Sequence, residues 1–109
     1  MPKTRNEALR LVREFRDRIA PLYGDRLKAV YLYGSFARDE AHEDSDIDLA
    51  VILAGPVSDW EEGKRTIAIV SELSLRENRV LVPFFFSEEE YEAAPEQLHR
   101  SIQREGVPA

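Results

Sequence analysis

The first quarter of the chain alternates apolar and polar residues with the period of a helix. Its apolar positions recur every three or four residues, which places them on one helical face. They are Ala8, Leu11, Val12, Phe15 and Ile19. Thr4 and Glu7 precede them in the T-x-x-E pattern of a capping box. We therefore predict a first helix that Pro21 and Gly24 end.

A second helical pattern follows the turn at Gly55 and Pro56. Ser58 and Glu61 offer another capping box, and the pattern continues to about Glu77. One face of this predicted helix carries the apolar residues Trp60, Ile67, Val70 and Leu73.

Three short segments carry the β-branched and aromatic residues typical of strands. They span residues 27–33, 46–53 and 79–86. The second is wholly apolar after its first residues, which indicates burial on both faces of a sheet. Pro83 has no N–H for a ladder, so we expect the third strand at an edge.

Short helices are predicted between and after the strands. One covers residues 36–41, and a capping box at Ser87 and Glu90 opens another. Pro95 begins a last helix that Gly106 ends. The residues expected to face inward from it are Leu98 and Ile102.

The order of these elements is α-β-α-β-α-β-α, with the closing helices taken as one unit. This order predicts a single α/β domain over residues 1–109. Its sheet is small, three-stranded and mixed, and helices flank it.

Composition narrows the class of protein. The chain has 109 residues, 43% of them apolar, and no cysteine, which excludes disulfides and thiolate chemistry. A net charge of −6 argues against nucleic-acid binding, which needs clustered Lys and Arg. No apolar run reaches the ~20 residues that span a membrane. Residues 1–13 lack the apolar segment of a signal peptide, so we expect a cytoplasmic protein.

Three aspartates at every second position, in the run D-S-D-I-D, form the main candidate site. A calcium loop needs a glycine at its sixth position and an acid at its twelfth. Counted from Asp44, those positions hold Leu49 and Gly55. The pattern is therefore not a helix-loop-helix calcium site.

Asp46 and Asp48 fit a different kind of metal site. Two apart on a strand, they point to the same face with Cα atoms ~6.5–7 Å apart. Carboxylates at this spacing can share a pair of Mg²⁺ ions in phosphoryl transfer. Asp44 lies before the strand, where it can cap the turn or hold an outer water. The alternative is that Asp46 and Asp48 are solvated charges at the start of a strand.

Gly34 and Ser35 form a sharp break after the first predicted strand. Glycine lets a ligand approach the backbone closely, and the N–H groups of a following helix would face a phosphate. The Ser35 hydroxyl and Arg38 can add contacts to phosphate oxygens. The alternatives are that Ser35 only shapes the turn and that Arg38 pairs with Asp39 or Glu40 at the surface.

The spacing of these residues resembles a known family. Ten residues separate Gly34-Ser35 from Asp46-x-Asp48. The stretch GSFARDEAHEDSDIDLAV is similar to the G-S-x10-D-x-D signature of the minimal nucleotidyltransferases, a branch of the DNA polymerase beta superfamily. The element order and the closing IQREGV also resemble this family, so the resemblance spans most of the chain.

The resemblance implies an activity and a partner. Gly34 and Ser35 would bind the nucleotide triphosphate, assisted by Arg38, and Asp46 and Asp48 would hold Mg²⁺. AMP would pass from ATP to a hydroxyl, with release of pyrophosphate. Small members of this family are often encoded beside a HEPN-domain protein, where they act as antitoxins, and some of them adenylylate a tyrosine of that partner. Because the chain is one small domain, the acceptor is expected from a partner protein or from a second subunit of a homo-oligomer.

The third predicted strand departs from the family pattern. Many active members carry a third metal-binding acid there, whereas residues 79–86 contain none. An alternative function is therefore a weak or inactive antitoxin that neutralises its partner by binding. A transferase acting on a small molecule such as an antibiotic is a further alternative, which the lack of a second domain disfavours.

The remaining conspicuous side chains do not predict a site. His42 and His99 have no second histidine at ligand spacing and are expected at the surface. Alternation along a strand buries at least one of Phe84, Phe85 and Phe86. Core packing is therefore the expected role for most of this run, with a docking surface as the alternative.

Overall fold

The computed structural model describes residues 2–97 and 107–108 of the chain. Its elements lie in the predicted order, except that no helix separates the first two strands. Along the chain they are α1 (Arg5–Tyr23), a 3-10 turn (Gly24–Arg26), β1 (Leu27–Tyr33), β2 (Ile47–Leu53), α2 (Asp59–Glu77), β3 (Leu81–Ser87), α3 (Glu88–Ala93) and β4 (Val107–Pro108).

The strands form one mixed sheet in the order β3-β2-β1-β4. β2 runs antiparallel to β1 and parallel to β3, while β4 pairs antiparallel with β1. The predicted α/β fold with a three-stranded mixed sheet is confirmed. The two-residue strand β4 was not predicted, because so short a segment carries no periodic signal.

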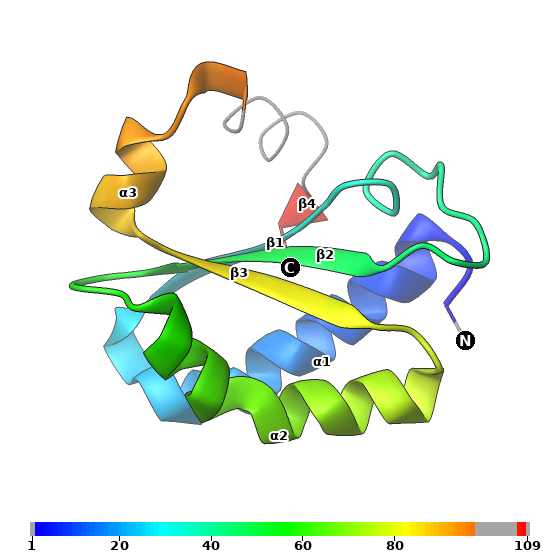
Figure 1. Cartoon of the computed structure of the whole chain (residues 1–109), viewed down its shortest axis with the longest axis horizontal. Coiled ribbons are helices and arrows are strands. Elements are labelled where there is room, and N and C mark those ends of the chain that lie inside the picture. Colours follow the sequence, from blue (N-terminus) through cyan, green and yellow to red (C-terminus); the bar gives the residue numbers. More distant parts are fainter. Residues whose placement is uncertain (1, 98–106, 109) are drawn as a thin grey trace.

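Helices α1 and α2 cover one face of the sheet, and α3 lies on the other side (Figure 1). The core fills the layer between the sheet and these two helices. Alternate residues of the strands point into it. The fully buried side chains there include Val12, Phe15, Ile19, Leu32, Ile47, Leu49, Val51, Leu53 and Leu73.

The predicted helix caps are present. The Thr4 hydroxyl accepts the Glu7 N–H at 3.2 Å, and Ser58 and Ser87 cap α2 and α3 in the same way. Pro21 does not end α1, contrary to the prediction, but lies inside its last turn. Gly24 ends the helix instead, with a φ of 55° that favours glycine.

The helix predicted over residues 36–41 is wrong, because this segment folds as successive turns. Its backbone bonds run from Arg38 N–H to Gly34 O and from Glu40 N–H to Ser35 O. Asp39 has a φ of 58°, a left-handed conformation that a right-handed helix cannot contain. Phe36 is fully buried, so the turns are shaped by packing.

Strand β3 lies at an edge of the sheet, as Pro83 predicts. Ile47 N–H donates to Val80 O, and alternate residues of a parallel strand bond the same neighbour. The backbone N–H and C=O groups of the odd-numbered residues of β3 therefore point away from β2, toward the open edge of the sheet. There Pro83 has no N–H to offer, and the Leu81 N–H already donates to Ser74 Oγ at 3.1 Å. This edge is poorly suited to adding another strand.

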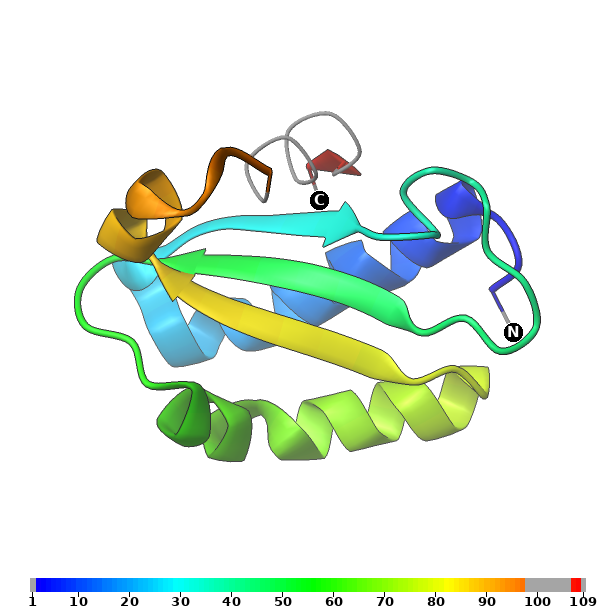
Figure 2. The same cartoon turned by 45° about the horizontal axis from the view of Figure 1, so that its top comes forward.

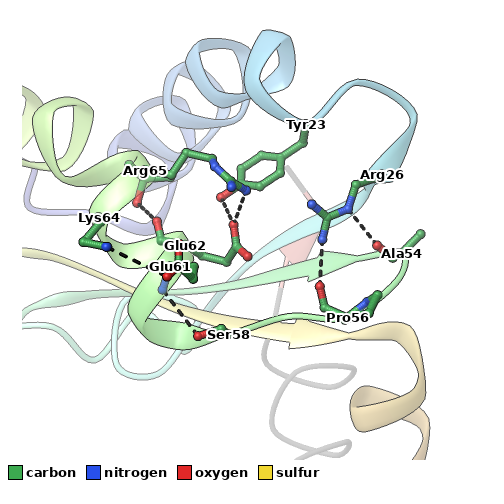
Figure 3. Close-up of polar contacts among 10 residues, drawn as sticks. Tyr23, Arg26, Ala54, Pro56, Ser58, Glu61, Glu62, Lys64 and Arg65 are labelled. Atoms are coloured by element: carbon green, nitrogen blue, oxygen red, sulfur yellow. Dashed lines mark hydrogen bonds and ion pairs between the residues drawn. The ribbon is translucent and has the colours of Figure 1, made fainter.

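A polar cluster joins α1 to α2 at the end of the sheet where β2 finishes (Figure 3). The Glu62 carboxylate is only 4% exposed. It accepts the Tyr23 hydroxyl at 2.9 Å and Arg65 Nη1 at 2.8 Å. Both bonds are accepted by Oε1. A buried acid needs such partners, so the bond from Tyr23 on α1 to Glu62 on α2 helps to hold the two helices together.

The last predicted helix is described only at its start. Glu96 and Gln97 are helical after Pro95. The rest of that prediction, with Leu98, His99 and Ile102, lies outside the described residues. No helix in the described part of the chain is both long and apolar enough to cross a membrane.

Candidate functional site

Gly34 and Asp48 meet where β1 ends and β2 begins. Tyr33, the last residue of β1, is the ladder partner of Asp48, and Gly34 follows with a φ of 78°. A Cβ atom placed on Gly34 would lie 2.5 Å from Asp48 Oδ2. The carboxylate therefore occupies the space that any other side chain at position 34 would need. The structure brings these two predicted site residues together.

Asp46 lies close enough to Asp48 to affect the pKa of Asp48. Asp48 is half-buried within the β1–β2–β3 ladder, and Asp46 is exposed just before β2. Burial first, and then the negative charge of Asp46, raise the pKa of Asp48 above its usual range, while Arg38 opposes them. A divalent cation would relieve this repulsion.

Ser35 and Arg38 lie in the turns beside these carboxylates. Ser35 is half-buried, and its carbonyl accepts the Glu40 N–H at 2.8 Å. Arg38 is exposed, and its Nε lies 3.1 Å from Glu40 Oε2, as the surface alternative expects. Its positive charge also acts on Asp48. Because residues 36–41 are not a helix, no helix N-terminus adds to a phosphate site here.

The third strand places no acid beside Asp48. The residue opposite Asp48 on β3 is Val82. Glu88 follows Ser87, which pairs with Leu53 at the far end of β2. Among the described residues, no group of three or more His, Cys, Asp or Glu side chains is arranged to hold a metal ion.

Two aromatic side chains lie next to Asp48 on the sheet face away from α1 and α2. The Tyr33 and Phe84 rings pack with centroids 5.9 Å apart. Phe84 is 42% exposed, whereas Phe85 on the opposite face is buried in the core. Burial, followed by the charge of Asp48, raises the pKa of Tyr33 to about 12. The site therefore has an apolar wall on one side of its carboxylates.

The donor set at this site fits a hard cation. Mg²⁺ is usually bound by one or two carboxylates, with water and substrate phosphates filling its other positions. Asp46 and Asp48 supply two neighbouring carboxylates, and burial, followed by the charge of Asp46, raises the pKa of Asp48. These two residues can hold a divalent cation that a phosphate ligand also contacts.

Two features of the site were missed by the sequence analysis. Tyr33 and Phe84 could have been found, because both share the strand parity that places Asp48 on the open face. Arg79 is buried at 6% exposure and donates to backbone carbonyls of the loop before Asp46. A single arginine between a helix and a strand carries no sequence signal of such a role.

Comparisons of sequence give a family for the chain. Residues 12–105 match the family described as Nucleotidyltransferase domain. A protein of Methanocaldococcus jannaschii, provisionally named a protein adenylyltransferase, is 31% identical over 80 residues, or 73% of this chain and 80% of that protein. An aminoglycoside nucleotidyltransferase (4') of Staphylococcus aureus is 37% identical over 51 residues, which are 47% of this chain and 20% of that protein.

Comparisons of structure agree on the fold. A protein of Sulfolobus solfataricus, provisionally named a nucleotidyltransferase, superposes with a TM-score of 0.59 at 20% identity, over 95% of this chain and 80% of that one. A toxin-antitoxin crystal structure with AMP-PNP gives a TM-score of 0.59 at 18% identity, over 87% and 69% of the two chains.

The family match covers most of the chain, and the fold agrees with it. The resemblance to the nucleotidyltransferases is thereby confirmed, and with it the class of enzyme. The chain belongs to the Nucleotidyltransferase domain family.

Proposed function

We propose that this chain transfers AMP from ATP to a hydroxyl group of a HEPN-type partner protein, in a reaction that needs Mg²⁺. The meeting of Gly34 with the Asp48 carboxylate carries this proposal. It joins the two halves of the G-S-x10-D-x-D motif at one place. A phosphate-binding turn and a pair of metal-binding carboxylates at one place are what nucleotidyl transfer requires.

Each predicted site residue has a role that suits its position. Asp46 and Asp48 would hold the metal ion. Gly34 leaves the backbone bare, so phosphate can approach the turn, and the Ser35 hydroxyl can donate to it. Arg38 adds a positive charge on the same side. The bound ion would neutralise charge on the triphosphate and orient its α-phosphate.

The proposed reaction is a substitution at phosphorus. The acceptor oxygen bonds to the α-phosphorus of ATP, and the bond from that phosphorus to the β-phosphate oxygen breaks. Pyrophosphate leaves, and the hydroxyl proton is released to solvent. The chain's own residues bind and align the reactants, which accounts for a large part of such catalysis.

The choice of nucleotide and partner is supported by proteins of the same fold. One structural neighbour is a toxin-antitoxin with AMP-PNP. Another, with a TM-score of 0.57 at 17% identity, is the pair named MntA-HpeT with two Asp→Glu substitutions two positions apart. That spacing is the one between Asp46 and Asp48 here. The relative from Methanocaldococcus jannaschii supports a protein as the acceptor.

Intact-mass spectrometry tests the proposal. The chain, ATP and Mg²⁺ are incubated with the product of the neighbouring gene as the candidate HEPN-type partner, and Asp48→Asn serves as the control. We expect the partner to gain one or more AMP units with the wild-type chain and none with the variant. An equal gain with Asp48→Asn would contradict the assigned site.

A second candidate function is neutralisation of the partner by binding alone. The observation that favours it is Val82 opposite Asp48, where an acid would complete the metal site. In that case the complex forms and the toxin is inhibited, but no mass is gained. Neutralisation that is lost in Asp48→Asn, while the complex persists, would contradict this second candidate.

A further inference from the structure

Arg79 is a buried cation at the end of the sheet that carries the candidate site. It lies between α2 and β3, and only 6% of the residue is exposed. At this end the turn before β3, the N-terminal segment and the loop after β1 come together (Figure 2). Within the described part of the chain its guanidinium pairs with no carboxylate. A buried charge needs other compensation.

That compensation comes from the loop that joins the two halves of the motif. Arg79 Nη1 donates to the carbonyls of His42 at 3.0 Å, Ser45 at 3.2 Å and Glu43. Arg79 Nε donates to Pro2 O at 2.9 Å. Nη1 has two hydrogens and three carbonyl acceptors, so at least one hydrogen is shared between two carbonyls. Bonds from a cation to carbonyls are stronger than neutral ones.

The same guanidinium also packs on the ring of Phe36. Its central carbon lies 5.2 Å from the ring centroid, within the range of a cation–π contact. Phe36 is fully buried and directly follows Ser35. One side chain therefore contacts both ends of the segment from the Gly-Ser turn to Asp46.

The two carboxylates depend on this contact to different degrees. Asp48 is paired in the ladder on both sides, with Tyr33 on β1 and Val82 on β3. Asp46 lies outside β2 and is exposed. The carbonyl immediately before Asp46 belongs to Ser45, and Arg79 bonds to it. Of the two carboxylates, Asp46 is therefore the one that directly follows a backbone carbonyl bonded to Arg79.

We propose that Arg79 is a positioning residue that holds Asp46 and the Gly34-Ser35 turn in place around Asp48. The effect of Arg79 on nucleotide binding rests on the proposed function. The positioning of the loop by Arg79 does not. Residues that orient metal ligands typically change metal affinity or activity by about 10- to 100-fold when replaced.

Arg26 provides a matched control at the opposite end of the sheet (Figure 3). Its Nε and Nη2 donate to Ala54 O and Pro56 O, each at 2.9 Å, and its guanidinium lies 5.9 Å from the Tyr23 ring centroid. Arg26→Met removes the same kinds of contact as Arg79→Met, but far from the candidate site. Arg79→Lys keeps the charge but replaces the separate Nε and Nη1 donors, which bond to Pro2 and to the loop, with a single nitrogen.

A double-mutant cycle measures whether Arg79 acts through Asp46. Calorimetric titration with AMP-PNP in saturating Mg²⁺ measures the affinity of four proteins. They are the wild type, Arg79→Met, Asp46→Asn and the double variant. We expect Arg79→Met to weaken binding about 10- to 100-fold in the wild-type background and by a smaller factor in the Asp46→Asn background, where only its contact beside the Gly34-Ser35 turn is still lost. The same weakening by Arg79→Met in both backgrounds, or by Arg26→Met, would overturn the proposal.

Amide hydrogen exchange of residues 36–46 separates this proposal from the proposed function. We expect faster exchange there in Arg79→Met, unchanged exchange in Arg26→Met and an intermediate rate in Arg79→Lys. Unchanged exchange in both Arg79 variants overturns the positioning role, whatever the binding result. A wild type that binds no AMP-PNP, with faster loop exchange in Arg79→Met, would instead contradict the proposed function alone. If Arg79→Met does not fold, Arg79→Lys replaces it in both measurements.

Discussion

The Asp48 carboxylate occupies the space where Gly34 would carry a side chain, with Oδ2 2.5 Å from the position of a Cβ atom. Gly34→Ala must therefore displace the carboxylate as well as hold alanine at a φ of 78°. We expect the variant to lose Mg²⁺-dependent nucleotide binding. The unfavourable φ alone costs about 1 to 3 kcal/mol of stability, and the clash adds to it.

Gly55 separates these two effects. Its φ of 82° is nearly the same, but a Cβ there would have no neighbour closer than Arg26 Nε at 4.0 Å. Denaturant unfolding should show a larger loss of stability for Gly34→Ala than for Gly55→Ala, and only the former should lose nucleotide binding. Equal losses in the two variants would contradict the contact between Gly34 and Asp48.

The charge of Asp48 is expected to destabilise the metal-free protein. Because burial and Asp46 raise the pKa of Asp48, the folded state holds this proton more tightly than the unfolded state. Stability from this group therefore falls as pH rises from the unfolded pKa through the folded one. Asp48→Asn removes the charge, so it should be more stable than the wild type at neutral pH.

Thermal unfolding without metal checks the sign of this effect. The advantage of Asp48→Asn over the wild type should shrink as the pH is lowered toward the ordinary aspartate pKa of about 3.9. Asp44→Asn, which alters an exposed carboxylate in the same loop, serves as the control. An advantage for Asp48→Asn that grows on acidification would be inconsistent with a raised pKa.

Val82 is the position at which a third carboxylate would complete the site. It lies opposite Asp48 on the parallel strand β3, about 4.8 Å away between strands. Val82→Asp should strengthen Mg²⁺-dependent nucleotide binding and raise the rate of transfer. It should also destabilise the metal-free fold by about 0.5 to 3 kcal/mol, because a third negative charge joins two others.

Phe84→Asp is the matched control for this gain of function. Phe84 lies on the same strand and face but pairs with Ala50, two ladder pairs further from Asp46. Calorimetric titration with AMP-PNP and Mg²⁺ should show stronger binding only for Val82→Asp. If both variants bind as the wild type does, a third acid is not what limits this site.

Tyr23 makes stability depend on pH in the alkaline range. Burial first, and then its hydrogen bond to Glu62, raise the pKa of Tyr23 to about 12. Between an ordinary tyrosine pKa of about 10 and about 12, the folded state keeps a proton that the unfolded state has released. Stability is therefore lost as pH rises through this window.

Tyr23→Phe should make that loss less steep and lower stability at neutral pH by about 0.5 to 1.5 kcal/mol, the net worth of a hydrogen bond. Urea unfolding at several pH values from 8 upward measures both effects. Tyr33→Phe should also reduce the slope, since burial and Asp48 raise the pKa of Tyr33 to about 12. Identical slopes in the wild type and both variants would contradict these pKa values.

The sequence was sufficient where the structure follows local rules. Helical spacing and capping residues predicted α1 and α2, and Pro83 predicted that β3 lies at an edge. The motif assigned Asp48 and Gly34 to one candidate site, and the structure places the two residues in contact. The motif could be recognised because its residues are close in sequence and belong to adjacent strands.

Predictions failed where contacts between distant segments decide the structure. Residues 36–41 have a helix-compatible sequence, yet burial of Phe36 and the left-handed conformation of Asp39 fold them into turns. The role of Arg79 depends on Pro2 and on the loop before Asp46, which lie 77 and 34 to 37 residues away in sequence. No local pattern encodes such contacts.

The central claim is that the Gly34-Ser35 turn and the Asp46–Asp48 pair form one nucleotide site that depends on a metal ion. Calorimetric titration with AMP-PNP tests it most directly, with Mg²⁺ or with EDTA, in the wild type and Asp48→Asn. The account predicts binding by the wild type with Mg²⁺, its loss in EDTA, and a weakening of about tenfold or more in the variant. Binding that is the same in EDTA or in Asp48→Asn, or no binding by the wild type, would contradict it.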